Sequence, residues 1–170
     1  MIFILTGPHH SGKTSLCKRI ADRLKRDGVL TDGFLSFSIH HEDRVIGYDL
    51  FDLKKQTSLP FIRKKGEEHW EKVGSYYFFP LGLAYAEEII SQSEKGSLLI
   101  VDEVGPQELK EKGLWPELKK IIFEGHQNLL LVIRERLLNQ YLNVLKAKGV
   151  KIFHIKDQNA EKVLIKALKR

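Results

Sequence analysis

The stretch with the clearest chemistry is residues 7–14, which read Gly-Pro-His-His-Ser-Gly-Lys-Thr. This is the pattern G-x-x-x-x-G-K-T, and it directly follows an apolar run. Glycines let the backbone approach an anion closely and direct its N–H groups toward it. Lys13 adds a positive charge for the terminal phosphates, and the Thr14 hydroxyl is a ligand for phosphate-bound Mg²⁺. The stretch therefore predicts a phosphate-binding loop.

A nucleotide bound there should contact the whole loop and the residue that follows it. The predicted nucleotide-binding residues are Gly7, Pro8, His9, His10, Ser11, Gly12, Lys13, Thr14 and Ser15. Lys13 is also predicted to be catalytic, because its charge reaches the β- and γ-phosphates. Adjacent histidines cannot easily converge on one ion, so His9 and His10 are expected to line the phosphate pocket and not to bind zinc.

A carboxylate pair, Asp102 and Glu103, follows the apolar run Ser97–Val101. A carboxylate at the end of a buried strand can hold Mg²⁺, so Thr14 and Asp102 are the predicted metal ligands. Strand side chains alternate, so Glu103 should point elsewhere and could orient or deprotonate a water. The pair favours hydrolysis and makes Glu103 the second predicted catalytic residue. The alternative is two acids that merely solvate a strand end.

Negative charge on a phosphoryl transition state also calls for a cation. Three arginines are possible sources: Arg134 follows an apolar strand, Arg63 lies in a polar basic loop, and Arg44 begins a β-like segment. For each of them the alternative is an ordinary surface position, and the sequence does not choose among the three.

The elements that must position these residues alternate along the chain. Residues 54–74 are polar and are predicted to be irregular. Strands are predicted at Met1–Thr6, Gly33–His40, Arg44–Leu53, Ser97–Val101, Asn128–Ile133 and Val150–Ile155, and helices at Lys13–Asp27, Pro80–Ser93, Leu114–Glu124, Glu135–Lys148 and Asn159–Lys169.

This alternation predicts an α/β fold of three layers with a mostly parallel central sheet and an inserted β-hairpin, turning at His40–Asp43. Ligands bind at the carboxyl ends of the strands in such sheets. The glycine loop, the pair Asp102–Glu103 and Arg134 all follow predicted strands. We therefore expect them to meet at one edge of the sheet.

Length and composition fit one ordinary globular domain spanning residues 1–170, with 42% hydrophobic and 29% charged residues. No stretch approaches the ~20 apolar residues of a membrane span, and the apolar N-terminus lacks the basic region of a signal peptide. The single cysteine, Cys17, lies on the apolar stripe of the first helix and fits a reducing compartment. A cytoplasmic protein without a membrane partner is expected.

The formal net charge of +6 is concentrated in residues 146–170, where eight lysines and arginines face two acids. The remainder of the chain is close to neutral. A solvated helix face explains such a tail better than a nucleic-acid groove does. Binding to nucleic acid is therefore not favoured.

These motifs together resemble a known family, the small P-loop nucleoside-triphosphatases that include the cancer-related NTPases and their thermophilic bacterial relatives. The resemblance extends over nearly the whole chain. It rests on the stretches Thr6–Thr14, Gly33-Phe34 with Arg44–Leu50, Val73–Tyr76, and Val101–Leu109, whose sequence Val-Asp-Glu-Val-Gly-Pro-Gln-Glu-Leu is similar to the family's D-E-I-G-x-M-E-L.

The resemblance implies a RecA-like domain and slow hydrolysis of ATP, GTP and other nucleoside triphosphates with Mg²⁺. It also marks Glu108 as the later acid of the last motif. The chain departs from the family pattern at Phe37 and His40, where an acid and an arginine are common, at Gln107 in place of methionine, and at Ala160 after Asn159.

The sequence therefore predicts Mg²⁺-dependent hydrolysis of nucleoside 5′-triphosphates to the diphosphate and phosphate. One alternative is a nucleotide or small-molecule kinase that uses the same loop. A second is a non-catalytic nucleotide switch or nucleic-acid partner. The physiological nucleotide, the oligomeric state and the pathway stay open.

Overall fold

The computed structural model describes residues 1–124, 128–145 and 149–169, and in them it forms one sheet in the strand order β5-β6-β4-β3-β2-β7-β8-β1-β9. The strands are β1 (Ile2–Gly7), β2 (Thr31–His41), β3 (Arg44–Asp52), β4 (Ser58–Arg63), β5 (Lys72–Val73), β6 (Tyr76–Phe78), β7 (Leu98–Val104), β8 (Asn128–Arg134) and β9 (Val150–His154). The helices are α1 (Lys13–Arg26), α2 (Pro80–Ser91), α3 (Trp115–Glu124), α4 (Leu138–Val144) and α5 (Ala160–Leu168).

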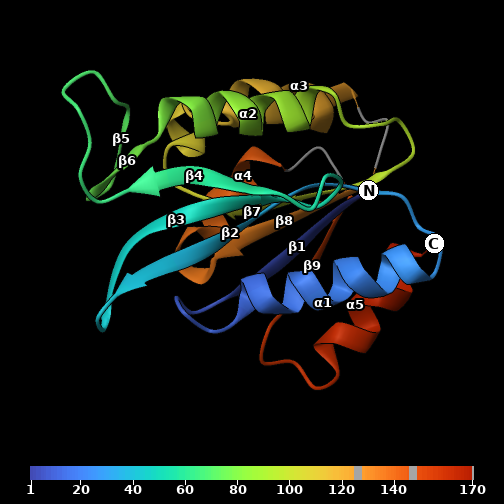
Figure 1. The fold of residues 1–170 in the computed structure, drawn as a ribbon. Coiled ribbons are helices and arrows are strands. Elements are labelled where there is room, and N and C mark those ends of the chain that lie inside the picture. Colours follow the sequence, from blue (N-terminus) through green and yellow to red (C-terminus); the bar gives the residue numbers. More distant parts are fainter. Residues whose placement is uncertain (125–127, 146–148, 170) are drawn as a thin grey trace.

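One half of the sheet, β2-β7-β8-β1-β9, is parallel, as the alternating pattern predicted. Helices α1 and α5 lie on one face of the sheet, and α2 and α3 lie on the other (Figure 1). Each face has its own hydrophobic core. Cys17 is fully buried in the core beneath α1, as its place on the apolar stripe predicted. The three-layer α/β prediction is confirmed.

The other half of the sheet is antiparallel and larger than the predicted hairpin. Strands β2 and β3 form that hairpin, and β4, β6 and β5 extend it outward. The prediction of an irregular segment over residues 54–74 is therefore wrong in part, because Ser58–Arg63 pairs with β3. Its polar composition concealed a strand whose apolar members, Leu59, Phe61 and Ile62, pack on the core.

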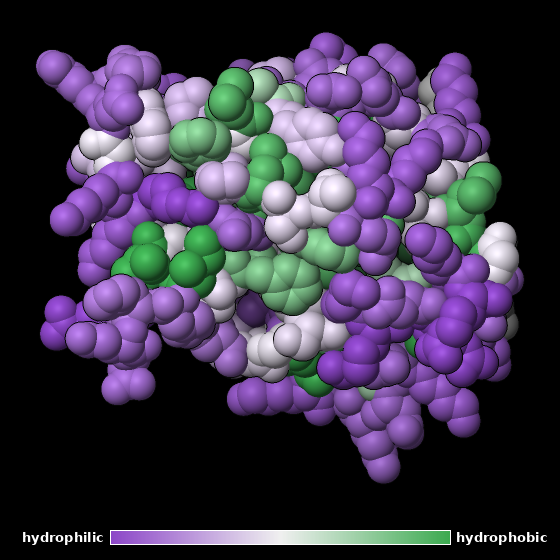
Figure 2. All heavy atoms as spheres, in the orientation of Figure 1, coloured by the Kyte–Doolittle hydropathy of each residue, from purple (hydrophilic) through white to green (hydrophobic). Residues whose placement is uncertain are grey.

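Smaller differences concern the chain after β8. Instead of a single helix over Glu135–Lys148, a 3₁₀ turn at Glu135–Leu137 precedes the short α4, and residues 146–148 lie outside the described part. No described helix is long and apolar enough to cross a membrane. On the face drawn in Figure 2, hydrophilic side chains predominate and a band of hydrophobic ones borders a small hollow.

Candidate active site

The glycine loop connects β1 to α1 in the strand–loop–helix order that its motif requires. Gly7 has φ +154°, and a Cβ there would lie 2.5 Å from Cγ2 of Ile155, which follows β9. The last glycine, Gly12, adopts a left-handed conformation immediately before the helix. The free N–H groups at the start of α1 therefore face the loop, where they can bind an anion.

The Lys13 side chain is folded into this loop. Its Nζ donates hydrogen bonds to the carbonyl oxygens of Pro8 (2.6 Å) and Gly7 (3.2 Å) and, at 3.4 Å, to Oγ of Ser11. Burial lowers the pKa of Lys13, and the neighbouring Glu103 carboxylate opposes this effect. The ammonium group is thus held within the loop, where a phosphate could replace its carbonyl partners.

Asp102 lies at the carboxyl end of β7 and is completely buried. Its Oδ2 accepts a hydrogen bond from the Ser36 N–H (3.1 Å) and its Oδ1 accepts one from the Glu103 N–H (2.9 Å). Burial, reinforced by the charge of Glu103, raises the pKa of Asp102 to about 7, while a hydrogen bond with the Thr14 side chain opposes the rise. A nearby cation would favour the ionised form of this carboxyl.

The neighbouring hydroxyls fit a hydrated Mg²⁺. Ser36 lines the same cavity as Thr14, yet its Oγ is buried and has no hydrogen-bond partner among the described residues. A buried hydroxyl without a partner is energetically unfavourable, and a metal-bound water would satisfy it. Hydroxyl and carboxylate oxygens are the donors that Mg²⁺ prefers. The described residues contain no group of three or more His, Cys, Asp or Glu side chains that could hold a metal ion, so hydroxyl groups and waters would have to complete the ligand set.

Glu103 reaches the cavity by a route that strand alternation did not predict. Its φ is +61°, and the pairing of β7 with β8 is irregular between Val101 and Val104. Such a bulge re-aims a side chain at a strand end. The Glu103 carboxylate is directed at Arg134, with Oε2 lying 2.7 Å from Nη2 and 3.1 Å from Nε.

The three arginines have different surroundings. Arg134 ends β8 and lies at the site, where it pairs with Glu103. The prediction of a loop position for Arg63 is wrong, because this residue ends β4 and pairs with Asp49 at 2.7 Å. Arg44 is exposed at the start of β3 and lines neither the cavity at the glycine loop nor the ones that adjoin it. Of these three arginines, Arg134 is the one that lines cavities next to the phosphate loop.

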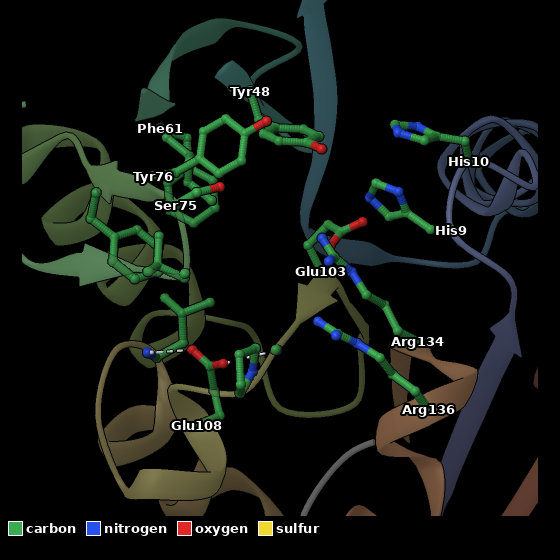
Figure 3. A pocket seen from close by; sticks show the side chains of 17 residues that line it. His9, His10, Tyr48, Phe61, Ser75, Tyr76, Glu103, Glu108, Arg134 and Arg136 are labelled. Atoms are coloured by element: carbon green, nitrogen blue, oxygen red, sulfur yellow. Dashed lines mark hydrogen bonds and ion pairs between the residues drawn. The ribbon is translucent and has the colours of Figure 1, made fainter. Parts of the chain in front are cut away.

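Two adjoining cavities meet at Glu103. The first, of about 210 Å³, is lined by residues 9–15, Ser36–Ser38, Tyr48 and Glu103, and we call it the phosphate cavity. Gly7 and Pro8 line a separate hollow beside Arg134. The second cavity, of about 270 Å³, is shown in Figure 3; it shares His9, His10, Tyr48 and Glu103 with the first, and we call it the aromatic pocket.

Ser36, Tyr48 and Arg136 are among the residues at these cavities that sequence reasoning missed. A signal existed for Ser36, because it follows Gly33-Phe34 in a strand whose parallel neighbour carries Asp102. Tyr48 comes from the antiparallel β3, and its proximity depends on the hairpin register. Arg136 lies in the turn that replaced the expected start of a helix.

This geometry defines a class of protein. A glycine loop joins the parallel strand β1 to α1, and the acids at the end of β7 lie near it in a three-layer α/β fold. These are the features of P-loop proteins, which bind nucleoside triphosphates.

Comparison with known proteins identifies the family within this class. A family model described as NTPase matches residues 2–168. The nucleoside-triphosphatase THEP1 of Hyperthermus butylicus is 28% identical over 160 residues, which cover 93% of this chain and 84% of that protein. The THEP1 of Methanopyrus kandleri is 30% identical over 78% of this chain and 73% of its own length. The chain belongs to this nucleoside-triphosphatase family.

Two solved structures share the fold. The solution structure of a human cancer-related nucleoside triphosphatase superposes with a TM-score of 0.74 at 24% identity, covering 98% of this chain and 95% of that one. The crystal structure of THEP1 from Aquifex aeolicus superposes with a TM-score of 0.73 at 23% identity over the full length of both chains.

Proposed function

We propose that this family member hydrolyses nucleoside 5′-triphosphates to the diphosphate and phosphate in a Mg²⁺-dependent reaction. The observation that supports this most directly is the meeting of Lys13, Thr14 and Glu103 at one cavity, with Asp102 bonded directly behind it. ATP, GTP or a related nucleotide is the proposed substrate.

Phosphate binding is the task of the loop. The backbone N–H groups of the loop, which every residue of 7–15 except Pro8 carries, surround the triphosphate. Lys13 exchanges its bond to the Pro8 carbonyl for one to the β- and γ-phosphates. Since the loop ends at the start of α1, the positive end of the helix dipole adds to the attraction.

The residues that would hold Mg²⁺ are Thr14, through its hydroxyl, and Asp102, through the water shell, with Ser36 as a further partner for a bound water. When bound, Mg²⁺ neutralises charge on the β- and γ-phosphate oxygens. Asp102 already accepts two backbone N–H groups, so its orientation is fixed by the protein before any ion arrives.

Glu103 acts on the attacking water. Glu103 lines both the phosphate cavity and the aromatic pocket, so it can reach a water next to a triphosphate held by the loop. It orients the water and accepts its proton as the new P–O bond forms. Arg134 fixes the Glu103 carboxylate and lies near enough to the loop to oppose the charge that develops on the phosphoryl group.

The test is phosphate release from ATP, GTP, CTP and UTP, with and without Mg²⁺, by wild type, Lys13→Ala and Glu103→Gln. We expect Mg²⁺-dependent turnover in wild type and a loss of about 10²-fold or more in both variants. Glu103→Gln should still bind nucleotide, because the amide keeps the shape of the acid. Unchanged hydrolysis by Glu103→Gln would show that this mechanism is wrong.

A further inference from the structure

The aromatic pocket lies outside the inner part of the glycine loop. None of its lining residues comes from Ser11–Ser15, which form the inner part of the phosphate cavity. The two cavities share His9, His10, Tyr48 and Glu103. A molecule in the aromatic pocket would therefore lie next to a triphosphate bound in the phosphate cavity, with Glu103 beside both.

One wall of the pocket consists of aromatic rings from the antiparallel half of the sheet. Tyr48 and Tyr76 meet edge to face with centroids 5.9 Å apart, and Phe61 contacts Phe78 at 5.4 Å. These ring contacts hold the side chains of the wall against one another. Aromatic walls with few polar groups are typical of sites for flat organic molecules.

The opposite wall is cationic. Figure 3 shows Arg134 and Arg136 on the side of the pocket away from the tyrosines, with Glu103 between. Arg134 is paired with Glu103, whereas for the exposed Arg136 no ion pair or hydrogen bond is found in the described part of the chain. A guanidinium without a partner is well suited to a carboxylate or phosphate on a ligand.

The buried acid that lines this pocket, Glu108, already accepts hydrogen bonds from the protein backbone. Glu108 is 3% exposed, and its carboxylate accepts the Gly105 N–H at 2.9 Å and the Leu114 N–H at 3.1 Å. Glu108 therefore has a structural role in the pocket lining, because both of its carboxylate oxygens accept backbone N–H groups. The volume of about 270 Å³ lies just below the ~300 Å³ at which ligand pockets usually begin, so the occupant must be compact.

We propose that the aromatic pocket binds a compact molecule with one flat ring, an anionic group and a hydroxyl, and that this hydroxyl accepts the γ-phosphoryl group in place of water. The ring would lie on Tyr48 and Tyr76, and the anion on Arg136. The acceptor oxygen bonds to the γ-phosphorus while the bond to the β–γ bridging oxygen breaks. The acceptor's proton passes to Glu103, and the nucleoside diphosphate leaves.

This inference rests on the proposed nucleotide site, so the experiment measures two products separately. Wild type is given ATP and Mg²⁺, and ADP and phosphate are quantified with no addition, with 4-(hydroxymethyl)benzoate, or with 4-methylbenzoate. Hydrolysis alone yields the two products in equal amounts. Transfer to the hydroxymethyl compound yields ADP in excess of phosphate, and 4-methylbenzoate, which lacks the hydroxyl, should lower phosphate release by occupying the pocket.

The matched variants are Tyr76→Ala and Tyr77→Ala. Both residues lie in β6, but Tyr76 lines the pocket whereas Tyr77 lies against Gly66. Loss of the Tyr76 ring should weaken binding of either benzoate about tenfold and return the product ratio toward equality. Tyr77→Ala should leave the ratio as in wild type.

Three results would overturn the inference. If ADP and phosphate stay equal with the hydroxymethyl compound, and 4-methylbenzoate does not change phosphate release, the pocket is not an acceptor site, while the hydrolysis itself upholds the proposed function. If Tyr76→Ala and Tyr77→Ala change the ratio alike, the effect does not arise in this pocket. If no ADP forms under any condition, both proposals are wrong.

Discussion

At the residue scale, the Ser36 hydroxyl is the most specific sign of a ligand. It is buried beside Thr14 and Asp102, and no described residue satisfies it. Replacement by alanine removes only that oxygen. We predict that Ser36→Ala weakens Mn²⁺ binding to the ADP complex about tenfold, because a metal-bound water loses a partner. Electron paramagnetic resonance of Mn²⁺ measures this without turnover.

The control for Ser36 lies two positions along the same strand. Ser38 lines the phosphate cavity as well, but its hydroxyl is exposed and hydrogen-bonds His40 at 2.9 Å. Ser38→Ala should bind Mn²⁺ as wild type does, and Ser36→Thr should restore binding because it keeps the hydroxyl. Equal Mn²⁺ affinity in Ser36→Ala and wild type would refute a role for Ser36 at the metal.

Arg134 is predicted to act by positioning Glu103. The guanidinium contacts one carboxylate oxygen through two nitrogens, at 2.7 Å and 3.1 Å. Arg134→Ala should lower kcat about 10–100-fold, the usual effect of losing a group that orients a reacting side chain, with little change in nucleotide affinity. Arg134→Lys should recover part of the loss.

The control for Arg134 is Arg44→Ala, since Arg44 is exposed on β3 and lines neither the phosphate cavity nor the aromatic pocket. Its kcat should equal that of wild type. A large rise in KM for Arg134→Ala at unchanged kcat would contradict positioning and would indicate that Arg134 binds substrate. Steady-state kinetics with ATP separates the two cases.

How far residue types alone could predict the site depends on how local each contact is. The loop and the Asp102–Glu103 pair lie in short motifs, so spacing was sufficient to find them. Arg63 is a residue that its local sequence could not place. Its basic neighbours suggested a loop, but it lies at the end of β4, where it pairs with the carboxylate of Asp49 on the neighbouring strand β3. Contacts set by sheet register are not visible in a linear pattern.

At the element scale, the segment after β7 depends on one buried acid. Glu108 accepts the N–H groups of Gly105 and Leu114 and thereby ties the loop after β7 to the start of α3. Glu108→Ala leaves both donors without a partner, so we predict a loss of about 2–4 kcal/mol in the free energy of unfolding. Urea unfolding measures it.

The comparison for Glu108 is Glu111→Ala in the same short turn. The Glu111 carboxylate is exposed and forms a surface ion pair with Lys119, so its removal should change stability by no more than about 0.5 kcal/mol. Glu108→Gln, which keeps one acceptor oxygen, should fall between the two. Similar stability of Glu108→Ala and Glu111→Ala would show that the buried bonds do not hold this segment.

The parallel strands were predictable because both of their faces are covered, so they read as continuous apolar runs such as Leu98–Val101. The antiparallel strands were harder to predict from the sequence. In β4 the single buried position, Phe61, stands among residues that are only partly covered, and a proline interrupts the pattern. The bulge at Glu103 has no sequence signal, because a left-handed glutamate is set by its surroundings and not by its own preference.

At the scale of the whole molecule, the basic excess lies in the C-terminal part of the chain. Lys151 is exposed on β9, Lys162 and Lys166 are exposed one turn apart on α5, and Lys169 pairs with Asp27 at 2.6 Å. Exposure is compatible with the predicted solvated helix face, and the preference against nucleic-acid binding stays a prediction. Lys146, Lys148 and Arg170 lie outside the described residues.

The candidate site exists only when the whole sheet is folded, because it joins the ends of β1, β2, β7 and β8, which are far apart in sequence. A nucleotide that binds there stabilises the native state and not the unfolded chain. At a free concentration of Mg·ADP one hundred times its Kd, we predict a gain of about 2.7 kcal/mol in the free energy of unfolding. Urea unfolding with and without Mg·ADP measures the gain.

Lys13→Ala at the same Mg·ADP concentration makes this prediction specific to the loop. Lys13 is 6% exposed and donates only to loop atoms, so its loss should weaken nucleotide binding and reduce the gain in the free energy of unfolding. Urea unfolding of Lys13→Ala and wild type without Mg·ADP measures the effect of the substitution on the fold itself. A gain equal to that of wild type would mean that Mg·ADP binds elsewhere on the molecule. A smaller gain would link nucleotide binding at the loop to the stability of the whole sheet, because every strand that contributes to the site must be in place for the ligand to bind.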